Sequence, residues 1–398
     1  MSTLKVAGLQ GLSASSDAIT LANDGTCTAN ITSINGGQLS GRKNLITNGE
    51  MIICQRVGTT STAVTNTSAY VLDRFLVSTA DGGGTSLNVQ QLHGNPTGAP
   101  YGFAASMKMT VAVTDDGGAD SFNAVQTRIE NLDTNYLAFG TSQAKTVTLS
   151  FYVKSSLTGT FGGSLVSGDF SRGNVFQYTI SSADTWEKKT ITIPGDTAST
   201  ADSVYNRGSA TSARGLVLYF DLGSGSNAEK SAANSWSATG TWSYGHRIAG
   251  NVKLCANAGA DWSITGVQLE EGSVATDFEH RSYGQELALC QRYCYADRGT
   301  NDYHAVAQGH FNGSTSGICM LYTPVCMRAA PTLSYPVGTW ILSGDAGTLN
   351  QSNIYPTDNI GEVNAFQVRG TVSGAQSGEG FLLRTSSNGH TWILDAEL

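Results

Sequence analysis

The stretch Thr146–Lys154 reads TVTLSFYVK, and large apolar side chains occupy every second position in it. Successive side chains of a β-strand point to opposite faces of the sheet, so this period of two predicts a strand that buries one face. The residues expected on the buried face are Val147, Leu149, Phe151 and Val153. The stretch therefore indicates a layered β-structure in which a sheet packs on a hydrophobic core.

The same strand signature recurs on the C-terminal side of this stretch. Phe176, Tyr178 and Ile180 repeat the alternation, and Trp186–Pro194 continues it until the proline ends the strand. Leu216–Phe220 is apolar throughout, which is typical of a strand covered on both faces. These runs predict a sheet with several neighbouring strands.

A change of parity marks the strand predicted over Trp262–Leu269. Its first half places Trp262 and Ile264 on one face, whereas its second half places Val267 and Leu269 there. The change falls at Gly266 and predicts a β-bulge. Strands of this length, separated by turn residues and without long helices, favour a sandwich or jelly roll.

Composition agrees with a turn-rich β-protein and excludes several classes. The 398 residues include 47 glycines, only 14% are charged, and the net charge is -8. Glycine does not recur at every third residue, so the chain is not collagen-like. The 40% hydrophobic content is too high for a disordered chain, and no heptad pattern indicates a coiled coil.

The sequence also argues against a membrane span, a secretory signal, nucleic acid as a partner and a disulfide framework. No apolar run is long enough for a membrane span, and residues 1–11 lack the apolar region of a secretory signal. The mild acidity argues against nucleic acid as a partner. Seven cysteines in so long a chain favour free thiols in a reducing compartment over a disulfide framework.

The expected fold class is all-β, with four parts. Residues 1–41 carry small hydrophobic residues at regular spacing, but these are too few for the segment to fold alone. The segment is therefore predicted to be an anchor or shaft for attachment or trimerisation, and a flexible tail is the alternative. Residues 42–281 form a jelly-roll β-sandwich, residues 282–300 a connector helix, and residues 301–398 a C-terminal β domain. Five strands are expected in the last part: Gly317–Thr323, Thr339–Leu342, Val363–Arg369, Phe381–Thr385 and Thr391–Leu398.

The connector helix is predicted from about Tyr283 to Tyr295. Ser282 can cap it, and Gln285 three residues later can complete a capping box. Gly299 is the expected stop signal. Cys290 and Cys294 would then lie on one face of the helix.

Six passages in this order resemble a widespread family of tailed-bacteriophage virion proteins. They are Gly41–Gly58 (GRKNLITNGEMIICQRVG), Tyr70–Phe75 (YVLDRF), Thr148–Phe161 (TLSFYVKSSLTGTF), Tyr178–Thr197 (YTISSADTWEKKTITIPGDT), Trp262–Tyr295 (WSITGVQLEEGSVATDFEHRSYGQELALCQRYCY) and Arg328–Leu333 (RAAPTL). The family is described as tail-fibre or virion structural proteins with a jelly roll similar to carbohydrate-binding modules. The family more often has Asp at Glu50 and an aromatic residue at Cys294.

The resemblance implies a non-enzymatic structural protein on the virion surface, made in the host cytoplasm. It implies a homotrimer, attached to other capsid or tail proteins through residues 1–41. A fibre-like appendage that contacts host surface glycans is the favoured role, and a decoration or adaptor protein without receptor function is the alternative. A glycan-depolymerising tailspike is a further alternative.

Catalytic and metal-binding patterns are weak. The run Gly313–Gly317 has Thr315 where a nucleophile elbow needs serine, and no phosphate-binding loop is present. Of the adjacent carboxylate pairs, Asp115–Asp116 reads as a turn, and Glu270 and Glu271 would point to opposite faces of a strand. Cys290 and Cys294 lack zinc-finger spacing, so core or interface cysteines are the favoured interpretation. The sequence indicates no catalytic residue, cofactor or metal.

A glycan-binding site is more plausible than a catalytic one. Trp236, Trp242 and Tyr244 lie in a polar, glycine-rich segment, and aromatic faces stack on the C–H surfaces of sugars. The favoured interpretation, however, is that one or two of these rings fill the sandwich core or an oligomer contact. Two charged pairs, Asp73–Arg74 and Arg128–Glu130, are interpreted as strand-end ion pairs of little energetic weight if exposed.

The low charge content suggests burial between subunits. A symmetric oligomer depletes charge at its interfaces, and surfaces rich in Ser, Thr, Asn and Gly allow β-elements to interlock without buried ion pairs. The sequence therefore favours a stable assembly, with a trimer as the expected state.

Overall fold

A computed structural model provides the structure of the chain. It describes residues 8–9, 19–21, 27–29, 41–80, 84–95, 97–115, 117–209, 212–238, 247–298, 305–334, 340–344, 347–351, 354–356, 365–371, 374–385 and 391–398. The predicted segment 1–41 therefore lies largely outside the described residues. Three short strands represent it, β1 (Gly8–Leu9), β2 (Ile19–Leu21) and β3 (Cys27–Ala29), and they form a small antiparallel sheet.

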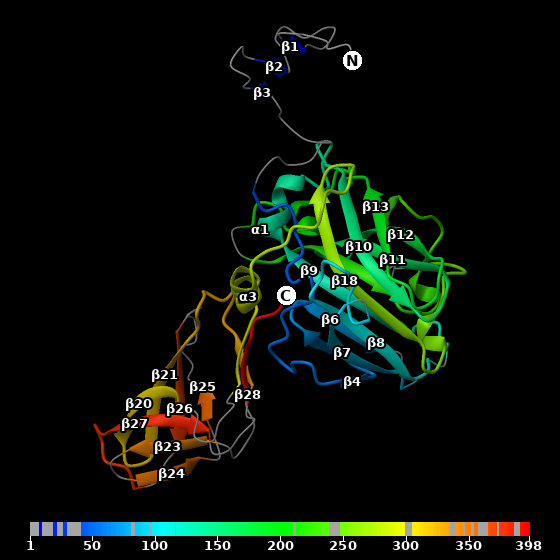
Figure 1. The fold of residues 1–398 in the computed structure, drawn as a ribbon. Coiled ribbons are helices and arrows are strands. Elements are labelled where there is room, and N and C mark those ends of the chain that lie inside the picture. Colours follow the sequence, from blue (N-terminus) through cyan, green and yellow to red (C-terminus); the bar gives the residue numbers. More distant parts are fainter. Residues whose placement is uncertain are drawn as a thin grey trace.

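The fold is all-β, and its largest part is a sandwich of two antiparallel sheets (Figure 1). The first sheet has six strands in the order β13 (Glu187–Ile193), β10 (Val147–Ser155), β18 (Asp261–Glu271), β8 (Ala105–Val113), β7 (Ser86–His93) and β4 (Thr62–Thr65). The second has seven, in the order β16 (Trp236–Ala238), β12 (Arg172–Ile180), β11 (Gly159–Ser167), β14 (Arg214–Asp221), β9 (Phe122–Glu130), β6 (Phe75–Ala80) and β5 (Ser68–Leu72). The chain crosses repeatedly between the sheets, as in a jelly roll.

The sequence-predicted alternation places the sandwich core correctly. Val147, Leu149, Phe151 and Val153 of β10 are fully buried, and the ring of Phe151 meets Phe220 edge-on at 5.0 Å. The bulge in β18 is confirmed, because its register against β10 shifts next to Gly266, which has a φ of 62°. Strand β14 is buried along nearly its whole length, as its apolar run predicted.

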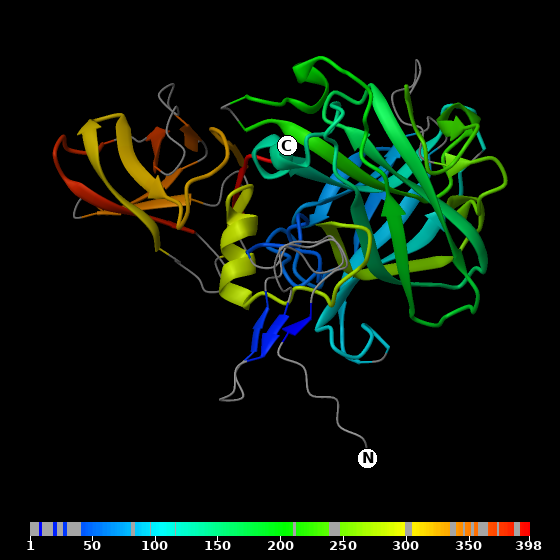
Figure 2. The same cartoon turned by 90° about the horizontal axis from the view of Figure 1, so that it is seen from above.

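The connector helix α3 (Tyr283–Gln291) begins as predicted and ends early. The capping box between Ser282 and Gln285 is present. The predicted end near Tyr295 is wrong, because Cys294 starts strand β19 (Cys294–Arg298). Residues Cys294–Arg298 pair with β28 (Thr391–Asp395), and this pairing satisfies the backbone groups of both strands. Figures 1 and 2 show α3 between the sandwich and the C-terminal sheets.

The C-terminal region contains two further sheets. One has the order β19, β28 and β22 (Thr332–Ser334). The other has the order β24 (Gly347–Gln351), β23 (Trp340–Gly344), β27 (Gly380–Thr385), β20 (Ala305–Gly313), β21 (Ser316–Tyr322), β26 (Ala365–Thr371) and β25 (Ile354–Pro356). Together they enclose a separate core that includes Phe311, Phe381 and Trp392. Strand β28 ends at Asp395, three residues before the predicted end at Leu398.

Short elements connect the main strands. They are the one-turn helices α1 (Asn131–Thr134) and α2 (Asp202–Tyr205), three 3-10 turns (Asn135–Leu137, Ser226–Ala228 and Leu254–Ala256), and a parallel pair of β15 (Glu229–Lys230) with β17 (Arg247–Ile248). Within the described ranges, no helix has the length and apolar character needed to cross a bilayer.

Buried ion pairs hold the C-terminal region against the sandwich, and they correct the two predicted strand-end pairs. Arg74 does not pair with Asp73: its guanidinium binds Glu397 and lies 3.4 Å from the centre of the Tyr293 ring. Asp73 pairs instead with Arg56, which also reaches Asp395. Glu397 and Asp395 lie near the other end of the chain from Arg74 and Arg56, so neighbouring charges in the sequence could not indicate these pairs.

Glu130 is the second contact across this junction. It does not pair with Arg128; its two carboxylate oxygens accept hydrogen bonds of 2.7 and 2.9 Å from Arg292, just after α3. The Tyr293 hydroxyl donates a further bond of 2.5 Å. Burial raises the pKa of Glu130, but the hydrogen bonds from Arg292 and Tyr293 outweigh burial and lower the pKa to about 2.

Candidate functional site

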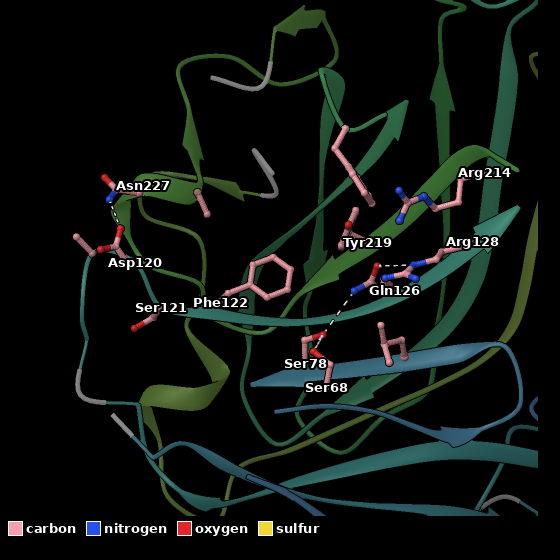
Figure 3. A pocket seen from close by; sticks show the side chains of 14 residues that line it. Ser68, Ser78, Asp120, Ser121, Phe122, Gln126, Arg128, Arg214, Tyr219 and Asn227 are labelled. Atoms are coloured by element: carbon pink, nitrogen blue, oxygen red, sulfur yellow. Dashed lines mark hydrogen bonds between the residues drawn. The ribbon is translucent and has the colours of Figure 1, made fainter. Parts of the chain in front are cut away.

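The described surface has a cleft of about 410 Å³ on the outer face of the seven-stranded sheet of the sandwich (Figure 3). Its volume falls in the range of small-molecule sites. The register of the sheet explains its floor: Tyr219 on β14 lies opposite Gln126 on β9, and Gln126 lies opposite Leu76 on β6. Their neighbours along each strand point inward to the sandwich core, so these side chains point outward.

A chain of polar side chains crosses the floor of the cleft. The Arg128 Nε donates to the side-chain Oε1 of Gln126 at 3.3 Å, and the side-chain Nε2 of Gln126 donates to the Ser78 hydroxyl at 3.5 Å. Ser68 donates to the same Ser78 hydroxyl at 2.8 Å. Hydroxyl and amide groups that are already oriented in this way can exchange hydrogen bonds with the hydroxyls of a ligand.

Aromatic rings form the walls. Phe122 is half-buried and meets the floor residue Tyr219 edge-on, with ring centres 6.2 Å apart. Phe170, also half-buried, belongs to the turn between β11 and β12, where it has a φ of 66°. A left-handed backbone at a bulky residue costs about 1–3 kcal/mol. The fold maintains this strain where it presents a ring to the cleft.

The cleft has one acidic and one basic end. At the acidic end, Asp120 accepts a hydrogen bond of 2.5 Å from Asn227. At the basic end lie Arg128 and Arg214, and the Arg214 guanidinium stands 4.3 Å above the ring of Phe170. Figure 3 shows both guanidinium groups on the side of Tyr219 and Gln126 away from Asp120.

This arrangement suits a sugar chain. Aromatic rings stack on the apolar faces of sugars, while amide, hydroxyl, carboxylate and guanidinium groups bind the hydroxyls around the ring. The cleft offers all of these within one volume. It does not offer the two carboxylates of a glycoside hydrolase, because Asp120 is the single acidic residue among the described residues that line it.

The candidate carboxylate pairs lie elsewhere. Glu270 is buried and accepts hydrogen bonds from Gln268 and Thr276, whereas Glu271 forms an ion pair of 3.0 Å with Lys145. Their different partners agree with the prediction that the two side chains do not converge. Asp115 accepts bonds from Ser121 and Asn123, and its neighbour Asp116 lies outside the described residues.

The two candidate cysteines are buried. Burial raises the pKa of both the Cys290 and Cys294 thiols, which disfavours the thiolate that metal binding requires. Their burial supports the interpretation as core cysteines, although Cys294 lies on β19 and not on the helix. Across the described ranges, no group of three His, Cys, Asp or Glu side chains is arranged to hold a metal ion.

Only one of the three aromatic residues predicted to bind glycans is described. Trp236 lies on the edge strand β16, where its indole N–H donates to the Pro194 carbonyl at 2.6 Å. Its ring meets Phe139 and Tyr205 edge-on, at 5.4 and 6.2 Å, and borders a second hollow of about 400 Å³. Trp242 and Tyr244 lie outside the described residues, so the site at Trp236, Trp242 and Tyr244 stays a prediction.

The cleft residues were missed from the sequence because they are dispersed. Gln126 and Arg128 come from one strand, Arg214 and Tyr219 from another, and Phe170 from a turn. The available signal was the alternation in β9, where long polar side chains at 126 and 128 separate the inward-facing residues. Without the order of the strands, that signal does not indicate which other residues share the face.

Comparison with known proteins gives no family. No family model and no curated protein matches the sequence. Similar solved structures include the enzymatically active domain of tailspike protein 4 of bacteriophage CBA120 (11% identity, TM-score 0.27, 57% of this chain and 21% of that chain). They also include TmCBM61 in complex with β-1,4-galactotriose (9%, 0.27, 58% and 99%) and a family 11 carbohydrate-binding module from Clostridium thermocellum (10%, 0.25, 55% and 98%). These TM-scores are too low to support an argument about this chain.

Proposed function

We propose that this chain is a non-catalytic virion surface protein that binds host surface glycans in the cleft on the seven-stranded sheet of the sandwich. The observation that carries the glycan-binding part is the cleft itself, in which Phe122 and Phe170 face a floor of oriented polar groups, among them Gln126. Stacking surfaces beside fixed hydrogen-bonding groups are what a sugar ring requires.

The proposed location on the virion is based on the sequence resemblance. As a bacteriophage appendage, the protein acts as a homotrimer held by residues 1–41 on capsid or tail proteins. Several copies on one particle raise the overall avidity, so that a cleft of modest affinity is sufficient for adsorption.

The test is binding of the full chain to a glycan array and to whole bacterial cells. We expect Phe122→Ala and Phe170→Ala each to weaken binding about ten-fold, since the loss of one stacking contact costs about 1.4 kcal/mol. Tyr101→Ala is the matched control, because Tyr101 is 78% exposed and does not line the cleft.

Three results separate the alternatives. Loss of binding in Trp242→Ala, with both phenylalanine variants unaffected, transfers the site to the Trp236–Tyr244 segment. If wild-type protein binds neither the array nor cells, the receptor role fails and a decoration protein remains. Light scattering that gives a monomer mass at low micromolar concentration contradicts the trimer.

A further inference from the structure

We infer that Leu132, Tyr136 and Tyr283, here named the entry patch, form a contact between copies of this chain in its homotrimer. The inference rests on the proposed assembly and specifies the surface through which the sandwiches meet. It starts from the position of the entry patch, which surrounds the point where residues 1–41 join the sandwich.

Large apolar side chains gather on the surface at this point. Leu132 is 47% exposed, Tyr136 41% and Tyr283 58%, and they are three of the seven exposed large hydrophobic residues among those that the structure describes. Leu132 lies on α1, and Tyr136 lies about one turn later on the 3-10 turn that directly follows, so the two side chains share one side of this helical segment. Single hydrophobic residues on a surface are common, whereas a group of them marks a contact surface.

Two arginines bring the parts of the entry patch together. Arg42, where the sandwich begins, forms an ion pair of 3.2 Å with Asp133 of α1. The Arg42 Nε also donates to the backbone carbonyl oxygen of Asn44 at 3.1 Å. Arg281, just before α3, donates to the same oxygen at 2.6 Å. Helix α1 and the start of α3, which carry the patch side chains, are therefore both held next to Arg42.

The charges beside the patch belong to ion pairs. Lys145 lies 5.2 Å from the centre of the Tyr136 ring and forms an ion pair of 3.0 Å with Glu271. On the α1 side, Arg42 is paired with Asp133. Identical surfaces can approach one another here without bringing unpaired like charges together. An apolar centre with a polar rim is also the usual anatomy of a protein interface.

A second copy of this chain is the partner that fits this position. Residues 1–41 carry too few hydrophobic residues to fold alone, and in the proposed assembly copies of this segment associate. Strand β3 ends at Ala29, and the chain is fixed to the sandwich from Arg42, so the residues between them span at most about 45 Å. Each copy of Arg42 therefore stays near the shared segment, and the patch around it is the part of each sandwich that faces its neighbours.

The first test is hydroxyl-radical footprinting of the full chain, which oxidises exposed tyrosine rings. Tyr101 and Tyr322 are the internal controls, because they are 78% and 68% exposed and lie outside the patch. In a single chain, the exposed fractions of the four rings differ by less than two-fold, from 41% to 78%. In the assembly, Tyr136 and Tyr283 should be oxidised about five-fold more slowly than the controls, because the centre of an interface excludes water.

The second test introduces a charge into the contact. Leu132→Glu and Tyr136→Glu should each raise the concentration at which half of the assembly dissociates by about ten-fold or more, because the new carboxylate would have to leave water. Tyr322→Glu is the matched control, since Tyr322 is an exposed tyrosine on β21, and this variant should dissociate like wild type. Sedimentation over a dilution series measures all three variants.

The outcomes separate the inference from the proposed assembly. If the wild-type assembly forms while all four tyrosines are oxidised in proportion to their exposure in the single chain, the inference is wrong and the homotrimer stands. If Tyr136 and Tyr283 are protected but both charged variants dissociate like wild type, residues 1–41 of the same chain cover the patch, and the inference is again wrong. If the wild-type chain is a monomer, the proposed homotrimer itself fails, and the inference fails with it.

Discussion

Glu130→Gln tests the junction between the sandwich and the C-terminal region. The substitution keeps the size of the side chain and removes the charge that Arg292 and Tyr293 bind. The pKa of Glu130 falls from 4.5 to about 2 in the folded protein. At about 1.4 kcal/mol per pKa unit, this shift corresponds to about 3 kcal/mol of stability.

The pH dependence follows from the direction of the shift. Because the pKa is lower in the folded state, the contribution is complete above about pH 5 and is lost as the pH falls from 4.5 toward 2. Urea unfolding should therefore show a difference of about 3 kcal/mol between wild type and Glu130→Gln near pH 7. Near pH 3 the difference should shrink to about 1 kcal/mol.

The matched control is Glu271→Gln, which breaks the partly exposed ion pair with Lys145. An exposed pair of this kind contributes about 1 kcal/mol or less, so this variant should unfold almost like wild type. A constant difference between wild type and Glu130→Gln from pH 7 to pH 3 would refute the reasoning. The stability would then depend on packing at Glu130 and not on its charge.

Two further substitutions test the fold. Gly266→Ala should lower the free energy of unfolding by about 1–3 kcal/mol, because the φ of Gly266 is 62° and the new Cβ would lie 2.7 Å from the Phe103 ring. Gly250→Ala is the control, since its new Cβ would enter open space, and it should lower the free energy by about 1 kcal/mol. Urea titration measures both. Glu397→Ala should lower the free energy of unfolding by about 3–5 kcal/mol, because the Arg74 guanidinium, only 2% exposed, then lacks its carboxylate partner. Limited proteolysis should cleave the junction of this variant faster than that of the wild type.

Each of these has a clear contrary result. Equal losses in the two glycine variants would show that the contact with Phe103 is unimportant and that φ alone matters. Unchanged proteolysis of Glu397→Ala would show that the ion pair of Arg56 with Asp395 and the hydrogen bond from Arg328 to the backbone oxygen of Ala396 hold the junction without the Glu397 carboxylate.

Local patterns predicted the parts of the fold that local forces determine. The alternation in Thr146–Lys154 gave the buried face of β10, and the parity change at Gly266 gave the bulge. The capping box at Ser282 gave the start of α3. Each of these depends on residues within a few positions of one another, which is the range over which a sequence pattern acts.

The end of α3 and the ion pairs depend on distant segments. Cys294 leaves the helix because it pairs with Asp395, about a hundred residues later in the chain. Arg74 and Glu397 are separated still further in the sequence. Adjacent charges such as Asp73 and Arg74 suggested a local pair, but the register of the sheets sends them to different partners.

The candidate site is dispersed for the same reason. A strand pattern predicts which residues point outward, but it does not predict which strands become neighbours. Gln126 and Tyr219 meet because β9 pairs with β14, and Phe170 reaches them from a turn on a third part of the sheet. Sequence reasoning therefore favoured the aromatic segment that is compact in the chain.

Strand β9 connects the cleft to the junction with the C-terminal region. Its outward residues Gln126 and Arg128 belong to the cleft, and its last residue, Glu130, is bound to Arg292 at the junction. The end of β9 is therefore one of the points at which the C-terminal region is held on the sandwich, beside the ion pairs of Arg74 and Arg56. The strand is hydrogen-bonded to β14 on one side and to β6 on the other, so two rows of backbone bonds hold it in place. A displacement of the C-terminal region would thus reach the floor of the cleft through a single strand.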